Sequence, residues 1–158
     1  MSDRFQVMVR KPLEFLCALL EVSCGNAQIT FEGDLSQFDI GGKCEVTRRP
    51  SISIPLDCPK NYEVMTVPLE PNTKEVIAKR ILPRAGIRHR VFYVLISKGD
   101  ELLLAAYDNW DPDCVSVSAD IGKPFLDSMF KAGVIWKYEP QDVWAKRKYL
   151  PRRGRWRV

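Results

Sequence analysis

The residues best suited to chemistry lie in one short acidic segment, Asp108-Asn109-Trp110-Asp111-Pro112-Asp113. Alternating carboxylate and amide oxygens are the ligands of calcium loops, and clustered carboxylates also hold magnesium for catalysis. A calcium loop that starts at Asn109 needs a glycine at its sixth position, where this sequence has Cys114. The flanking residues are also typical of strands rather than of helices. A calcium loop is therefore not expected, and we assign no metal site here; a metal-dependent activity of the carboxylate cluster stays as a minor alternative.

Two other interpretations of this segment stay open. Asp, Asn and Pro form tight turns and cap their own backbone, so the segment is consistent with an ordinary solvated turn. Large aromatic side chains are enriched at protein interfaces, and two of them lie among these carboxylates. Our hypothesis is a loop that binds a protein partner with a basic surface. Its expected contact residues are Tyr107, Asp108, Trp110, Asp111 and Asp113.

A second pair of carboxylates, Glu32 and Asp34, lies in the expected turn Glu32-Gly33-Asp34. Two carboxylates can serve as acid and base, but solvated turn residues are the more common case. Nothing in the sequence brings this turn close to Asp108. We add Glu32 and Asp34 to the expected partner surface and assign them no catalytic role.

Other catalytic arrangements find little support. His89 is the single histidine, so a Cys–His or Ser–His hydrolase would have to use it. Its neighbours Arg88 and Arg90 supply no orienting acid, and the chain has no GxSxG, GxGxxG or Walker lysine. The five cysteines are an odd number without a CxxC pair, which disfavours a disulfide framework and a zinc knuckle. We therefore expect a protein that is not an enzyme and needs no cofactor.

The basic charge of the chain is concentrated at its end. Residues 145–158 hold 7 of the 24 Lys and Arg and none of the 20 Asp and Glu, so the tail carries +7 and residues 1–144 carry −3. Bases neutralise phosphates and interleaved aromatics stack on unpaired bases, so the alternative function is nucleic-acid binding. The residues concerned are Lys146, Arg147, Lys148, Arg152, Arg153, Arg155, Trp156 and Arg157.

The acidic segment follows the expected centre of the fold. Val91–Ser97 and Leu102–Tyr107 are apolar runs joined by Lys98-Gly99-Asp100-Glu101, which is the pattern of a β-hairpin. Neither run alternates apolar with polar residues, so both faces of each strand should be covered. This hairpin is therefore predicted to lie in the middle of the sheet.

Helices and further strands surround this hairpin. Other strands are expected at Phe5–Val9 and Ser51–Pro55 (both at an edge), Ala27–Phe31, Tyr62–Leu69, Cys114–Ser118 and Val134–Tyr138. One helix should begin at Pro12 and end before Gly25, and a second should begin with a capping box of Asn72 and Glu75. A third, around residues 122–132, should turn Phe125, Leu126, Met129 and Phe130 inward. The fold class is α+β, with about three helices on a mainly antiparallel sheet in one domain, residues 1–144, followed by the tail.

Three features of the sequence bear on the cellular compartment that we expect. No apolar run approaches the roughly 20 residues that span a bilayer. The residues after Met1 show no basic stretch followed by an apolar one, so no secretory signal is expected. Unpaired, reduced cysteines suit the cytoplasm.

Two segments resemble parts of small bacterial domains. They are Ile29-Thr30-Phe31-Glu32-Gly33-Asp34-Leu35-Ser36 and Ala106-Tyr107-Asp108-Asn109-Trp110-Asp111-Pro112-Asp113-Cys114. Some of these domains are similar to immunity proteins, which neutralise a partner toxin by binding it. The resemblance covers only these segments and implies a non-enzymatic binder; the basic tail has no counterpart in it.

Overall fold

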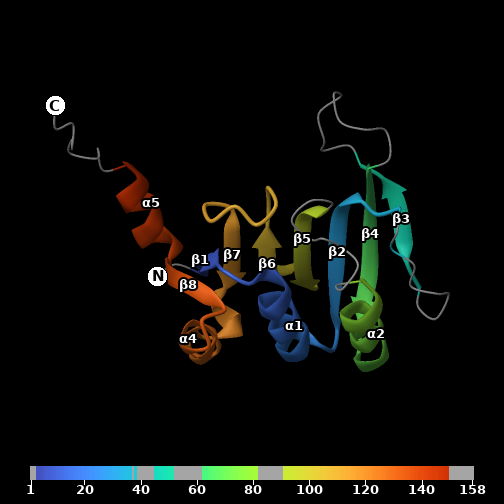
Figure 1. Cartoon of the computed structure of the whole chain (residues 1–158), viewed down its shortest axis with the longest axis horizontal. Coiled ribbons are helices and arrows are strands. Elements are labelled where there is room, and N and C mark those ends of the chain that lie inside the picture. The colour runs from blue at the N-terminus through green and yellow to red at the C-terminus, as the bar shows by residue number, and fades with distance from the viewer. Residues whose placement is uncertain (1–2, 37, 39–44, 52–61, 82–90, 150–158) are drawn as a thin grey trace.

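One antiparallel sheet organises the molecule. The computed structural model describes residues 3–36, 38, 45–51, 62–81 and 91–149. Over these residues the sheet has eight strands in the order β3-β4-β2-β5-β6-β7-β1-β8 (Figure 1). The strands are β1 Arg4–Val9, β2 Ala27–Asp34, β3 Thr47–Pro50, β4 Tyr62–Leu69, β5 Val91–Lys98, β6 Glu101–Ala106, β7 Val115–Ser118 and β8 Ile135–Pro140. Helices and antiparallel strands together confirm the α+β class.

The described helices pack along this sheet. They are α1 Pro12–Ser23, α2 Pro71–Val76, α4 Lys123–Lys131 and α5 Gln141–Tyr149, with a π-helical turn η1 Ile77–Ile81 and a 3₁₀ turn η2 Ala119–Ile121. Figure 1 shows α4, α1 and α2 in a row along the sheet and α5 beyond β8. None of the helices in the described ranges is long and apolar enough to cross a membrane.

The core follows from strand register. Ile29 pairs with Val67 and Ile96, and Ile96 pairs in turn with Leu104. Because side chains on paired residues share a face, this row of apolar side chains crosses four strands on one side of the sheet. Helix α1 buries its own apolar stripe in the same core, and each such side chain contributes about 1.5–3 kcal/mol. The apolar α1 residues of the core are Phe15, Leu16, Leu19 and Leu20; the polar Ser23 is also buried.

The central hairpin is confirmed. β5 and β6 are neighbours in the middle of the sheet, with β2 on one side and β7 on the other. The link is shorter than the expected four residues, since Lys98 and Glu101 already pair across the strands. Gly99 has a φ of 57°, a conformation that glycine adopts without strain, and this allows the turn to close over Gly99 and Asp100 alone.

Two strand predictions were wrong in position. β1 is not an edge strand, because β8 pairs with its outer side and Val7 is fully buried. The expected turn at residues 32–34 is the end of β2, where Glu32 pairs with Val64 of β4 and Tyr93 of β5. Pairing on both sides outweighs the turn tendency of Gly33 and Asp34. Of the expected strand Ser51–Pro55, residues 52–55 lie outside the described residues.

The helix ends also differ in detail. The capping box of α2 joins Glu70 and Thr73, not Asn72 and Glu75, because Pro71 takes the first helical position. In α4, Leu126 is buried as expected, but Phe130 is 53 % exposed. Helix α5 runs from Gln141 to Tyr149 and so crosses the expected start of the tail at residue 145.

Candidate functional site

The acidic loop, residues 108–113, has an unusual backbone. Asp108, Asn109 and Trp110 have φ values of 49°, 56° and 65°. Left-handed backbone costs an L-residue roughly 1–2 kcal/mol, least for Asp and Asn, whose short side chains bond locally. A bulky residue such as Trp110 adopts it only where its surroundings hold it.

The packing of the Trp110 ring in the core holds its backbone in this conformation. Trp110 is only 4 % exposed and meets Phe15 of α1 edge-on, with ring centroids 6.4 Å apart. Its indole N–H finds no acceptor among the described residues. Trp110 therefore anchors the loop to the core from within, and its expected place on the partner surface does not fit this burial.

Backbone hydrogen bonds fix the rest of the loop. The Asn109 N–H donates to the Phe92 carbonyl of β5 at 3.1 Å, and the Tyr107 N–H donates to the Cys114 carbonyl at 3.0 Å. The Asp113 N–H donates to Asp111 Oδ1 at 2.9 Å. The loop is thus held by backbone hydrogen bonds to β5, across its base and within itself.

The fixed backbone points the carboxylates outward. Asp108, Asp111 and Asp113 are exposed, as is Tyr107 at 39 %. The indole of Trp144 in α5 donates to Asp113 Oδ1 at 3.2 Å, so the last described helix touches this loop. In the described part of the chain, no group of three or more His, Cys, Asp or Glu is arranged to hold a metal ion.

Tyr93 joins the two acidic segments, and sequence reasoning missed it. Its ring meets that of Tyr107 edge-on at 5.2 Å, and Glu32 is its cross-strand partner. Burial raises the pKa of the Tyr93 phenol, and the charges of Asp108 and Glu32 raise it further. The structure therefore brings Glu32 and Asp108 to the same tyrosine. Tyr93 could not be identified from the sequence, because its place beside Glu32 depends on the pairing of β2 with β5.

Glu32 is engaged by a neighbour, and Cys114 is disfavoured as a nucleophile. Glu32 is 9 % exposed and accepts a hydrogen bond from the Ser51 hydroxyl. Burial and the charges of Asp108 and Asp111 raise the pKa of the Cys114 thiol. The thiolate that a nucleophile requires is therefore disfavoured at neutral pH.

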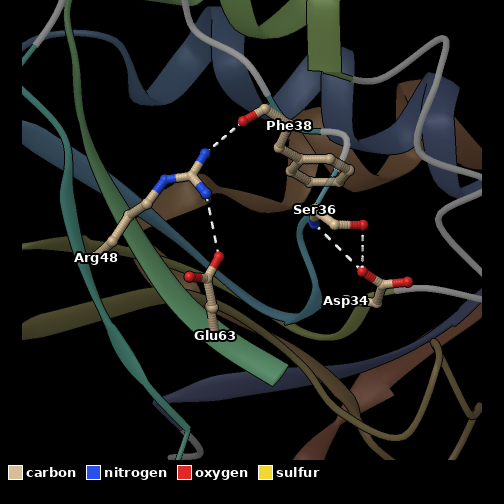
Figure 2. A network of polar contacts seen from close by, with 5 residues as sticks. All are labelled: Asp34, Ser36, Phe38, Arg48 and Glu63. Atoms are coloured by element: carbon tan, nitrogen blue, oxygen red, sulfur yellow. Dashed lines mark hydrogen bonds and ion pairs between the residues drawn. The ribbon is translucent and has the colours of Figure 1, made fainter. Parts of the chain in front are cut away.

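Asp34 is engaged in local structure. Its Oδ1 accepts bonds from the backbone N–H and the hydroxyl of Ser36, at 3.2 and 2.7 Å (Figure 2). Nearby, Arg48 of β3 bridges the Phe38 carbonyl and the carboxylate of Glu63. Asp34 thus shapes the chain after β2.

The basic residues of the tail divide between described and undescribed parts. Lys146 is exposed on α5, and Arg147 and Lys148 lie in the same helix. Arg152, Arg153, Arg155, Trp156 and Arg157 lie outside the described residues, as does His89.

Comparison with known proteins adds no relative. No protein-family model, curated protein or solved structure matches this chain.

Proposed function

We propose that this chain is a non-enzymatic protein-binding module that engages the basic surface of a protein partner through its acidic loop. The contact residues are Tyr107, Asp108, Asp111 and Asp113, with Tyr93 and Glu32 behind them. If the chain acts as immunity-type domains do, that partner is a toxin.

One observation carries this proposal. The loop holds left-handed backbone at three successive residues and uses a buried tryptophan to do so, yet its carboxylates face solvent. Strain of this kind is retained where the shape of a segment matters. A preformed loop loses little conformational freedom when it binds, and its charges steer a basic partner toward it.

Neutralising substitutions test the proposal. The variant Asp108→Asn/Asp111→Asn/Asp113→Asn removes three charges while Asn keeps both the left-handed backbone and the side-chain acceptor. The matched control Glu14→Gln/Glu75→Gln/Asp100→Asn removes the same charge at exposed positions elsewhere. Immobilised full-length chain is exposed to nuclease-treated lysate of its source cells, and retained proteins are identified by mass spectrometry.

A single basic protein, bound stoichiometrically by the wild type and the control but not by the loop variant, is the expected result. If all three chains retained the same protein equally, the acidic loop would be ruled out as its binding surface.

The alternative, nucleic-acid binding by the tail, rests on the exposure of Lys146 and on the uncompensated charge of residues 145–158. It predicts that the chain retains nucleic acid when nuclease is omitted, with affinity falling steeply as salt rises. The variant Arg152→Gln/Arg153→Gln/Arg155→Gln/Arg157→Gln should abolish that retention and leave the loop's protein partner bound.

A further inference from the structure

A cavity of about 370 Å³ lies at the other end of the central hairpin, away from the acidic loop. The last turn of α1 forms one wall with Val22, Ser23 and Cys24. The β5–β6 hairpin contributes Lys98, Glu101 and Leu103, and the 3₁₀ turn η2 contributes Asp120 and Ile121. A cavity of this volume is within the range that small ligands occupy.

The cavity walls carry an excess of negative charge. Glu101 and Asp120 supply two carboxylates against the single ammonium of Lys98, which is exposed at the end of the hairpin. The carboxyl end of α1 adds partial negative charge, and its last turn contains no basic residue that would offset it. The cavity therefore favours a positive group.

Two further cations lie near the cavity but do not line it. The charge of Arg4 offsets part of that of Glu101, and its guanidinium donates to the Leu102 carbonyl and to Ser116. Lys74 pairs with Glu21 at 2.6 Å.

Ser118 connects the Glu101 carboxylate to the backbone of Asp120. The hydroxyl of Ser118, at the end of β7, donates to Glu101 Oε1 at 2.5 Å. The same hydroxyl oxygen accepts the Asp120 backbone N–H at 3.2 Å and so caps η2. Ser118 is itself only 6 % exposed, whereas Glu101 is half-buried and Asp120 is exposed.

Ser23 supplies a further polar group in the wall. The residue is 5 % exposed, and its hydroxyl oxygen has no hydrogen-bond partner among the described residues. A buried polar group without a partner is unfavourable, so such groups are rare in folded proteins. Because Ser23 lines the cavity, a donor bound there is a candidate partner for this hydroxyl.

We infer that this cavity binds the ammonium group of a small aliphatic amine. Glu101 and Asp120 balance the charge, the α1 carboxyl end and the Ser23 hydroxyl accept N–H bonds, and Val22, Leu103 and Ile121 cover the alkyl chain. An amine and an amino acid both carry such a group, and only the amino acid carries a carboxylate for Lys98.

Calorimetric titration of the full chain with three probes tests the site. Putrescine carries ammonium groups alone, leucine adds a carboxylate, and 1,4-butanediol has hydroxyls in place of the amines of putrescine. We expect saturable binding of putrescine or leucine, with butanediol at least tenfold weaker. Tighter binding of leucine that Lys98→Gln removes would identify an amino acid as the ligand.

Variants separate the cavity from general electrostatics. Glu101→Gln and Asp120→Asn should each weaken amine binding at least tenfold, whereas Asp100→Asn, one residue away and outside the cavity, should not. Val22→Trp should block the cavity, and because Val22 is 53 % exposed the helix should tolerate it. Thermal unfolding confirms that each variant is folded. Absence of saturable binding by both amines, equal binding of butanediol, or an equal effect of Asp100→Asn would overturn the inference.

Discussion

Trp110 links the shape of the acidic loop to the stability of the core. Removing a buried aromatic ring leaves a cavity, so Trp110→Ala should lower the free energy of unfolding by about 3–5 kcal/mol. Trp110→Phe should lower it much less, because it keeps a ring against Phe15 and removes an indole N–H without an acceptor in the described structure. Urea unfolding followed by circular dichroism measures both values.

The control is Trp136→Ala. Trp136 is 59 % exposed and meets only the guanidinium of Arg10 among the described aromatic and cation–π contacts, at 4.6 Å from its ring centroid. Its removal should change the free energy of unfolding by less than about 1 kcal/mol. Similar losses at the two tryptophans would contradict the anchoring role of Trp110.

Tyr138 makes the free energy of unfolding depend on pH in the alkaline range. Burial raises its pKa to about 12, and the hydrogen bond that its phenol donates to Asp127 of α4 acts in the same direction. The folded state therefore binds the phenolic proton more tightly than the unfolded chain, whose tyrosine has a pKa near 10. This contribution is complete below about pH 10 and is lost as the pH rises through the folded pKa.

The difference in unfolding free energy between wild type and Tyr138→Phe, measured in urea at several pH values, isolates this residue from the lysines that titrate in the same range. The wild-type advantage should shrink between pH 10 and about 12. A difference that stays constant over that range would show that the Tyr138 proton is not stabilised by the fold.

Helix α2 shows how local signals compete at an element's end. The Thr73 hydroxyl is the centre of the observed cap: it accepts the Glu70 N–H at 2.7 Å and donates to the Pro68 carbonyl at 2.6 Å. Thr73 is 4 % exposed, so Thr73→Val should leave both backbone groups without a partner and lower stability by about 1–3 kcal/mol. Denaturant unfolding gives this value.

Glu75→Ala is the comparison for that cap. If Glu75 formed the capping box with Asn72 that the sequence suggests, its substitution would lower the free energy of unfolding. Among the described residues, its side chain forms an exposed 3.5 Å ion pair with Lys79, which contributes about 0.3–0.5 kcal/mol. If Glu75→Ala lowered the free energy of unfolding more than Thr73→Val, the capping box of Asn72 and Glu75 would be supported instead.

The elements that the sequence predicts well are those whose pattern is local. The apolar runs of β5 and β6, the stripe of α1 between Pro12 and Gly25, and the α4 stripe around Leu126 depend on spacing alone. The edge position assigned to β1 failed because its partners β7 and β8 lie more than a hundred residues later in the chain. Pairing at that distance leaves no trace in a local window.

The candidate site was predictable to the same extent. The acidic loop is a contiguous segment, so its residues and their exposure could be anticipated. The inward turn of Trp110 depends on Phe15 in α1. The approach of Glu32 to Asp108 depends on Tyr93 of β5, which pairs with Glu32 of β2 and interacts with the charge of Asp108. Both are tertiary contacts that residue types alone do not specify.

At the scale of the whole molecule, β6 lies between the two proposed binding surfaces. The strand begins at Glu101, which lines the cavity, and ends at Ala106, just before the acidic loop. A strand of six residues spans roughly 20 Å, which is beyond the Debye length of about 8 Å at physiological salt. Charges at one end should therefore act weakly at the other.

The two sites should accordingly bind independently. Asp108→Asn/Asp111→Asn/Asp113→Asn should leave the dissociation constant for putrescine within about twofold of wild type, since substitutions without shared partners at this separation are additive. Glu101→Gln should likewise leave capture of the basic partner unchanged. Calorimetry at 150 mM salt measures the first effect and quantitative pull-down the second. A tenfold change in either direction would mean that the hairpin couples the two ends, and reciprocal changes of equal size would identify that coupling as allosteric.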